Sequence, residues 1–180
     1  MTRPHSLSTR ALAALAVSLV LLTGCTADPK PSPSPTPTPL FASKKDAFAA
    51  AEATYRAYND ALNLVDPADP ATFEAVFERT TGDFQAVDRK NLSVMHAEEL
   101  TVSGANTVVA FHPLRTTATY DEVRARICVD VSSVQIVDAR GASRVAQDRA
   151  PIYVADVTFV WSDDAYLISR ASKADDSSCG

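Results

Sequence analysis

Residues 122–132 read EVRARICVDVS, and apolar and polar side chains alternate along the whole stretch. Successive side chains of a β-strand point to opposite faces, so the alternation predicts a strand with one buried and one exposed face. The apolar face must take the core. That face carries Val123, Ala125, Ile127, Val129 and Val131, and the other face carries Arg124, Arg126, Cys128 and Asp130.

Further strands are predicted on both sides of this stretch. Alternation favours strands at residues 100–102, 107–119, 134–138, 152–161 and 165–171. Turn-forming residues lie between them, at Ser103 and Gly104, at residues 139–141 and at residues 162–164. Short connections of this kind indicate a meandering antiparallel sheet.

The residues before the sheet have a helical period. Phe41, Phe48, Tyr55 and Leu62 recur every seven residues, which predicts an amphipathic helix over residues 43–63 with Ser43 as its N-cap. A second, short helix is expected from Pro70 to residue 78 with Asp69 as its N-cap, and a third helical or irregular segment follows residue 82. Helices followed by a sheet of about five or six strands predict the α+β fold class.

The first 25 residues indicate a bacterial lipoprotein signal. Arg3 and Arg10 precede an apolar run at residues 11–22, and LTGC (residues 22–25) ends that run. The run is shorter than the roughly 20 residues that a spanning helix needs. The pattern resembles a lipobox, so we expect cleavage after residue 24, fatty acylation of Cys25 and anchoring at the outer face of the bacterial cytoplasmic membrane. An ordinary secretory signal and a short buried helix are the alternatives.

A proline-rich tether follows at residues 25–42. Proline occupies every second position from Pro29 to Pro39, with Lys, Ser or Thr between. Each ring fixes φ and removes a donor, so this segment favours polyproline II and holds the domain roughly 40 Å from its anchor. Residues 43–180 are then expected to form one domain in the cell-wall space.

Charge excludes one class of partner. The chain has a net charge of −5, and removal of residues 1–24, which contain two arginines and no acid, makes it −7. An acidic domain repels nucleic acid, so we expect no nucleic-acid partner. The sequence has no HExxH, GxSxG, phosphate-binding glycine loop or calcium loop, so we expect no metal and no cofactor.

The three cysteines also fit an exported protein. If lipid occupies Cys25, Cys128 and Cys179 remain, and two thiols outside the cytoplasm are expected to form a disulfide. The bridge would close a loop of about 50 residues and stabilise the fold by about 4 kcal/mol. The alternative is a buried free Cys128 beside an unpaired Cys179.

The order of these features resembles a known group of proteins. A long amphipathic helix, two shorter helical pieces and about five or six strands are similar to the NTF2-like, cystatin-like α+β superfamily. With the lipobox, the tether, RICVDVS (residues 126–132) and a cysteine near the C-terminus, the chain resembles small actinobacterial lipoproteins that carry such a domain. The resemblance implies helices on a curved sheet and carries over no functional residue.

Candidate site residues come from the strands. His112, with Ala110 and Val108 on its face and Asp130 on a neighbouring strand, is a candidate acid or base, and a half-exposed strand histidine is the alternative. Arg124, Arg126 and Asp130 suit an anionic ligand if their face lines a cavity. The outer, solvated face is favoured for them because the opposite face is apolar. Aromatic side chains of the strand at residues 152–161, among them Tyr153, could stack a ring or simply pack.

These observations predict a lipid-anchored, non-catalytic binding domain whose partner is an envelope protein or a small ligand. The alternative is a small cavity enzyme of the isomerase, dehydratase or hydrolase type that uses His112 or Asp130 as its base. Sheets of this superfamily often pair through an exposed face, so a homodimer is a further expectation.

Overall fold

A computed structural model describes residues 38–174 and residue 179. The described residues belong to one compact unit, Thr36–Gly180. The signal, Cys25 and most of the tether lie outside the described residues, so the expectations about them remain predictions. Within the described part, no helix is both long enough and apolar enough to cross a bilayer.

Helices occupy the first half of the described chain. Helix α1 spans Lys44–Asn63, and Ser43 caps it by accepting a hydrogen bond from the Asp46 amide, as predicted. A 3-10 turn η1 (Pro70–Phe73), capped by Asp69, leads into the short helix α2 (Glu74–Phe77). Helix α3 spans Gly82–Ala97.

Six strands form two antiparallel sheets in the described part. A four-stranded sheet has the order β2-β3-β5-β6, and a separate two-stranded sheet pairs β1 with β4. The bounds are β1 Thr101–Ser103, β2 Thr107–Thr116, β3 Glu122–Asp130, β4 Gln135–Val137, β5 Ile152–Ser162 and β6 Ala165–Lys173. The predicted fold class is confirmed, with the six strands divided between the two sheets.

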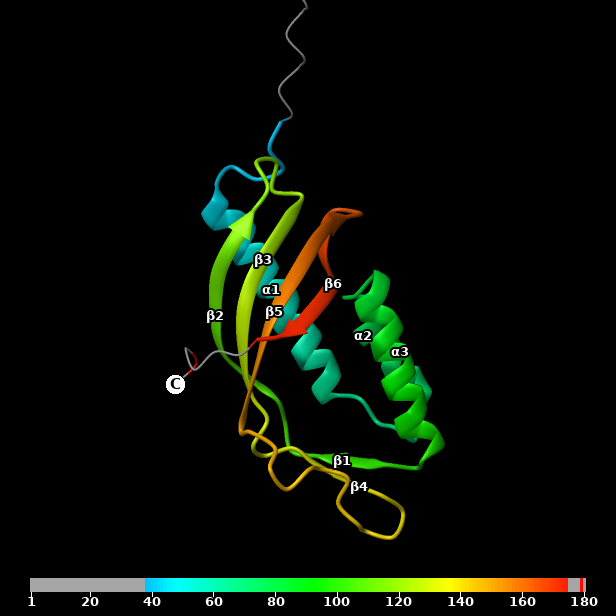
Figure 1. Cartoon of the computed structure of the whole chain (residues 1–180). Coiled ribbons are helices and arrows are strands. Elements are labelled where there is room, and N and C mark those ends of the chain that lie inside the picture. The colour runs from blue at the N-terminus through cyan, green and yellow to red at the C-terminus, as the bar shows by residue number, and fades with distance from the viewer. Residues whose placement is uncertain (1–37, 175–178, 180) are drawn as a thin grey trace, which may run out of the picture. The chain divides into compact units, whose positions relative to one another are not determined.

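The core lies between α1 and the concave face of the larger sheet. Figure 1 shows α1 crossing behind this sheet, with α2 and α3 beside β6. Val123, Ala125 and Ile127 of β3 are fully buried, as the alternation predicts, and Phe159 of β5 lies beside them. Full burial of each larger side chain of this kind contributes about 1.5–3 kcal/mol to the stability of the folded state.

Aromatic rings join the start of the domain to the sheet. Phe41 stacks on Tyr166 at 5.5 Å between ring centroids and meets Trp161 edge-on at 5.0 Å. The Leu40 amide donates a hydrogen bond to the Thr119 carbonyl nearby. The domain's packing therefore begins before α1.

The two-stranded sheet, which we call the arm (β1 and β4), projects beyond the larger sheet (Figure 1). Its base depends on Gly104, whose φ of +80° is unfavourable for other residues. A Cβ at this position would lie 2.1 Å from the Ser133 carbonyl oxygen, so no other side chain fits without movement. Arg144 and Glu98 connect the arm region to the end of α3 through a 2.6 Å ion pair.

Two irregularities change which side chains of β2 share a face. The β2–β3 register shifts between Val108 and Ala110 and again between Pro113 and Arg115. Val108 therefore pairs with Val129 and packs against the core, whereas His112 pairs with Arg126. The expectation that Val108 shares the face of His112 is wrong, because the bulge inserts one extra residue.

The edges of the larger sheet differ. At Ile168 the edge of β6 pairs with the segment before α3: the Thr81 amide donates to the Ile168 carbonyl, and the Ile168 amide donates to the Arg79 carbonyl. β2 is the other edge and has no further strand beside it among the described residues.

The disulfide between Cys128 and Cys179 is confirmed. The two Cα atoms lie 5.8 Å apart, and the bond joins residues 51 positions apart. Cys128 is on the face of β3 that points away from α1, yet it is fully buried. The bond therefore holds Cys179 against the outer face of the sheet.

Replacing both bridge cysteines by alanine should lower the free energy of unfolding by about 4 kcal/mol, because the open chain regains the entropy of a loop of about 50 residues. Urea unfolding of the variant and the oxidised protein measures the difference. The reductant-treated protein should match the variant. Equal midpoints for the oxidised and reduced protein would contradict the prediction.

Candidate functional site

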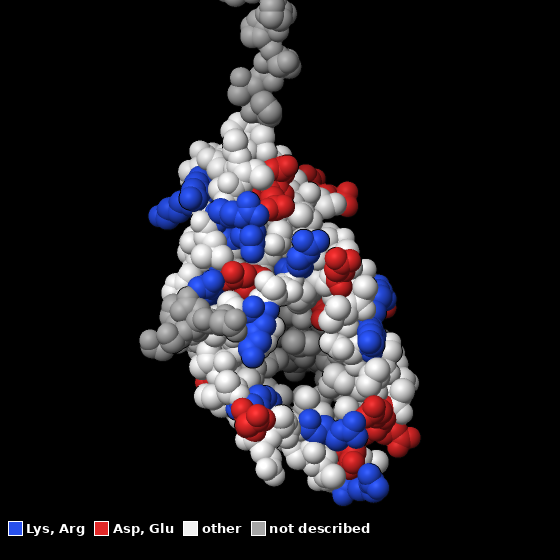
Figure 2. All heavy atoms as spheres, viewed as in Figure 1, with Lys and Arg blue, Asp and Glu red and all other residues white. Residues whose placement is uncertain are grey.

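A cavity of about 790 Å³ lies between the ends of α1 and α3, the arm and the start of β5. Figure 2 shows the surface hollowed in this region. This volume is in the range of cavities that bind small organic ligands. Its apolar lining includes Leu62, Val65, Leu92, Met95, Val131 and Ile136.

Helical spacing brings the apolar side chains to the cavity. Leu62 and Val65 are three residues apart at the end of α1 and just beyond it, and Leu92 and Met95 have the same spacing on α3. Residues three or four apart share one face of a helix, so each helix presents a short apolar stripe. The arm supplies the opposite wall through Ile136 and Val102.

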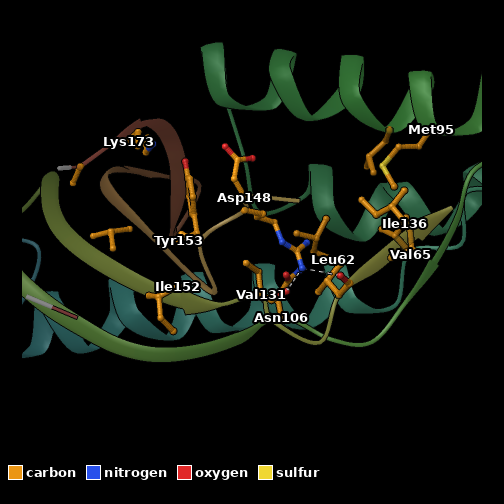
Figure 3. A pocket seen from close by; sticks show the side chains of 17 residues that line it. Leu62, Val65, Met95, Asn106, Val131, Ile136, Asp148, Ile152, Tyr153 and Lys173 are labelled. Atoms are coloured by element: carbon orange, nitrogen blue, oxygen red, sulfur yellow. Dashed lines mark hydrogen bonds between the residues drawn. The ribbon is translucent and has the colours of Figure 1, made fainter. Parts of the chain in front are cut away.

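Five polar residues also line this cavity: Asn106, Asp148, Arg149, Tyr153 and Lys173. Nη2 of Arg149 donates to the carbonyls of Val131 and Val134, at 2.8 Å each. Two backbone acceptors thus fix the guanidinium at the cavity wall. Lys173 lies at the end of β6, and Tyr153 lies near the start of β5 (Figure 3).

A carboxyl and three tyrosines gather between α1, α3 and β5. The Tyr58 hydroxyl donates to Oδ1 of Asp88 at 3.3 Å, and the rings of Tyr55 and Tyr58 lie 5.7 Å apart. Oδ2 of Asp88 is buried and has no hydrogen-bond partner. A buried acceptor without a partner is uncommon and indicates a missing water or ligand, or a functional role.

Burial changes the acidity of this cluster. Burial raises the pKa of Asp88 from 3.8 to about 6, and the Tyr58 hydrogen bond only partly offsets this. Burial also raises the pKa of Tyr55, and the charges of Tyr153 and Asp88 add to the effect. The pKa of Tyr58 is also raised, first by burial and then by the negative charge of Asp88. A carboxyl that titrates near pH 6 can take and return a proton near neutral pH.

Asp88 is not among the residues that line the cavity, but it lies close to one of them along α3. It is one helical turn from Leu92, which lines the cavity, so both side chains share a face of α3. Tyr153 lines the cavity and is also close enough to Tyr55 and Tyr58 to raise the pKa of each. Tyr153 therefore lies between the cavity and the Asp88 cluster.

The predicted arginines lie on the outer face of the larger sheet. Nε of Arg126 donates to Oδ1 of Asp156 at 2.7 Å, and Nη2 donates to Oδ2 at 3.2 Å. The Arg126 guanidinium in turn lowers the pKa of Asp156. Arg124 lines a small pocket of about 170 Å³ beside Asp156 and Arg170. Neither Arg124 nor Arg126 lines the large cavity.

His112 and Asp130 lie on the same outer face, and neither lines the large cavity. His112 is exposed and pairs in register with Arg126. Asp130 accepts a hydrogen bond from the Ser132 amide, and contacts with Ser132 lower its pKa. The structure brings His112 and Asp130 onto one face, but neither side chain is part of the cavity lining.

Sequence reasoning missed Asp88, Arg149 and Lys173. Asp88 stands in a polar stretch of α3, and no local pattern signals that Tyr58 of another helix faces it. A carboxylate on the same helical face as Leu92 and Met95 is the one signal that was present. Among the described residues, no group of three or more His, Cys, Asp or Glu side chains could hold a metal ion.

Comparisons with known proteins agree with this architecture. No family model matches the chain, and no curated sequence matches it. A structure described as "a putative aromatic ring hydroxylase" from Novosphingobium aromaticivorans superposes with a TM-score of 0.53 at 14% identity, covering 72% of this chain and 88% of that one. The intermembrane space region of chloroplast protein ARC6 superposes with a TM-score of 0.51 at 15% identity, covering 69% and 94%. The chain has the NTF2-like fold.

One prediction needs correction here. The expectation of a non-catalytic domain is contradicted, because a protein that shares the fold is described as an enzyme. That expectation rested on the absence of familiar catalytic motifs, but a single carboxyl beside a cavity requires no such motif.

Replacing Asp88 by asparagine should change how stability depends on pH. A carboxyl whose pKa is raised in the folded state stabilises that state below its unfolded pKa and loses this contribution as the pH rises through the folded value. Between about pH 4 and pH 7 the protein should therefore lose about 2 kcal/mol relative to Asp88→Asn, after allowance for the partial exposure of Asp88.

Urea unfolding of both proteins at pH values across this range measures the difference. Asp83→Asn, on the exposed first turn of the same helix, is the matched control and should run parallel to the unmodified protein. A constant offset between Asp88→Asn and the unmodified protein would contradict the raised pKa.

Proposed function

We propose that this protein is a small cavity enzyme that binds a compact apolar molecule between α1, α3 and the arm and transfers a proton on it. Asp88 is the acid or base of the proposed reaction. The observation that carries the proposal is the buried Oδ2 of Asp88, which has no hydrogen-bond partner and belongs to a carboxyl whose pKa is raised to about 6.

The chemistry follows from these properties. At neutral pH the carboxyl is mainly ionised, yet it is more basic than an exposed aspartate, so it can remove a proton from carbon next to a carbonyl group. Tyr153, which lines the cavity, is placed to donate a hydrogen bond to the oxygen on which charge develops. Isomerisation and dehydration are reactions of this class. His112 and Asp130 have no role in this proposal.

Deuterium exchange into 2-tetralone, a compact apolar ketone, tests the proposal. The protein should accelerate exchange of the acidic C–H protons, and the rate should rise with pH through about 6 as Asp88 loses its proton. Asp88→Asn should lose the acceleration by at least about tenfold, whereas Asp83→Asn should keep it. Equal exchange in Asp88→Asn and the unmodified protein would refute the role of Asp88.

The proposed site of action is the outer face of the bacterial cytoplasmic membrane. We propose that a fatty acyl group on Cys25 anchors the chain there and that the proline-rich tether spaces the domain from the bilayer, as small actinobacterial lipoproteins do. The order of charge, apolar run, Gly24 and Cys25 supports this. A small ligand is the partner that we propose, and an envelope protein and a homodimer remain predictions.

Cys25→Ser should release the protein from the membrane fraction of the producing bacterium. Mass spectrometry of the unmodified protein should find an acylated cysteine at the start of the processed chain. Cys128→Ser, which removes a different thiol, should remain with the membrane. An unprocessed chain with a bare Cys25 would refute the anchor.

A further inference from the structure

The lining of the large cavity is divided into two ends. Figure 3 shows Tyr153 and Lys173 together at one end and Met95, Ile136 and Val65 at the other. The second end is apolar and comes from the helices and the arm. The end with Tyr153 and Lys173 is formed by the N-terminal part of β5 and the C-terminal residue of β6. A ligand that fits both ends has an apolar body and one polar end.

The charges of the lining favour an anion. Two cations, Arg149 and Lys173, and one acid, Asp148, line the cavity. Neither cation forms an ion pair with an acidic side chain among the described residues. Arg149 is already fixed by two backbone carbonyls through a single nitrogen, Nη2.

Arg149 and Lys173 can each bind an anionic group, Arg149 from a fixed position and Lys173 because its side chain is exposed. A guanidinium has five N–H donors, so the donors of Arg149 other than those on Nη2 are available to a ligand. Lys173 is exposed at the end of β6 and can move its ammonium toward the cavity. Asp148 and Lys173 are both exposed, so water screens their charges more than the charge of the half-buried Arg149, and the least screened charge of the lining is positive.

We infer that the ligand of this cavity is an amphipathic organic anion. Its apolar body packs against Met95, Val65 and Ile136, and its acidic group lies between Lys173 and Arg149. The inference rests on the proposed function, because both place the substrate in this cavity. It adds the chemical class of that substrate. No covalent step is involved.

Two fluorescent probes with one ring system test the inference. 1-Anilinonaphthalene-8-sulfonate carries an acidic group, and N-phenyl-1-naphthylamine is the same molecule without it. The chain beginning at Thr26 is used, because it keeps the whole compact unit Thr36–Gly180. It should bind the sulfonate about threefold to fivefold more tightly than the neutral probe, as expected for a partly exposed charge pair.

Variants identify the cation that is responsible. Lys173→Gln should weaken sulfonate binding about threefold and leave the neutral probe unchanged, and Lys173→Arg should restore the preference. Lys90→Gln, on the exposed side of α3, is the matched control and should change neither affinity. Added salt should reduce the preference in the unmodified protein and not in Lys173→Gln.

The outcomes separate this inference from the proposed function. If both probes bind equally tightly while 2-tetralone exchange persists, the inference is refuted and the proposed function stands. If Lys173→Gln keeps the full preference for the sulfonate, the role of Lys173 is refuted. If neither probe binds and 2-tetralone exchange is absent, both the inference and the proposed function are refuted.

Discussion

The alternation of side chains along β3 is the constraint on which the rest of the structure depends. Its apolar side is fully buried under α1, and its other side carries Cys128 and Arg126. A shift of one residue would expose the core face and bury two arginines, so the register of this strand is strongly fixed. The disulfide of Cys128 and the ion pair of Arg126 with Asp156 both lie on the second side. The two-residue alternation of β3 therefore determines both which side chains enter the core and which lie on the outer face.

Much of the fold could be predicted because its signals are local. Ser43 and Asp69 cap helices where a capping side chain precedes a helical period, so both starts are confirmed to the residue. The disulfide followed from counting thiols rather than from geometry. The division of six strands into two sheets was not foreseen, because it depends on where the arm leaves the larger sheet. The bulge that moves Val108 to the core side also has no clear sequence signal.

The candidate site was harder to predict than the fold because it is assembled from distant segments. The pKa of Asp88 is raised only because the folded chain buries the carboxyl, and the hydrogen bond from Tyr58 opposes the rise. Arg149 and Lys173 reach the cavity from a loop and from the end of a strand, where the sequence has no periodic pattern. His112 attracted attention because histidine titrates near neutral pH, yet the structure places it on the outer face. The burial of Asp88 and the exposure of His112 therefore decide which of the two is a candidate acid or base, and the residue type alone does not.

The two edges of the larger sheet have a consequence for self-association. One edge is interrupted by the chain itself, through the bonds between residues 79–81 and Ile168. The other, β2, is bent by two bulges and contains Pro113, which has no amide hydrogen to donate. A straight strand from another molecule finds no continuous ladder on either side. The sheet is therefore a poor seed for fibrils, even where many copies of the domain are held close together.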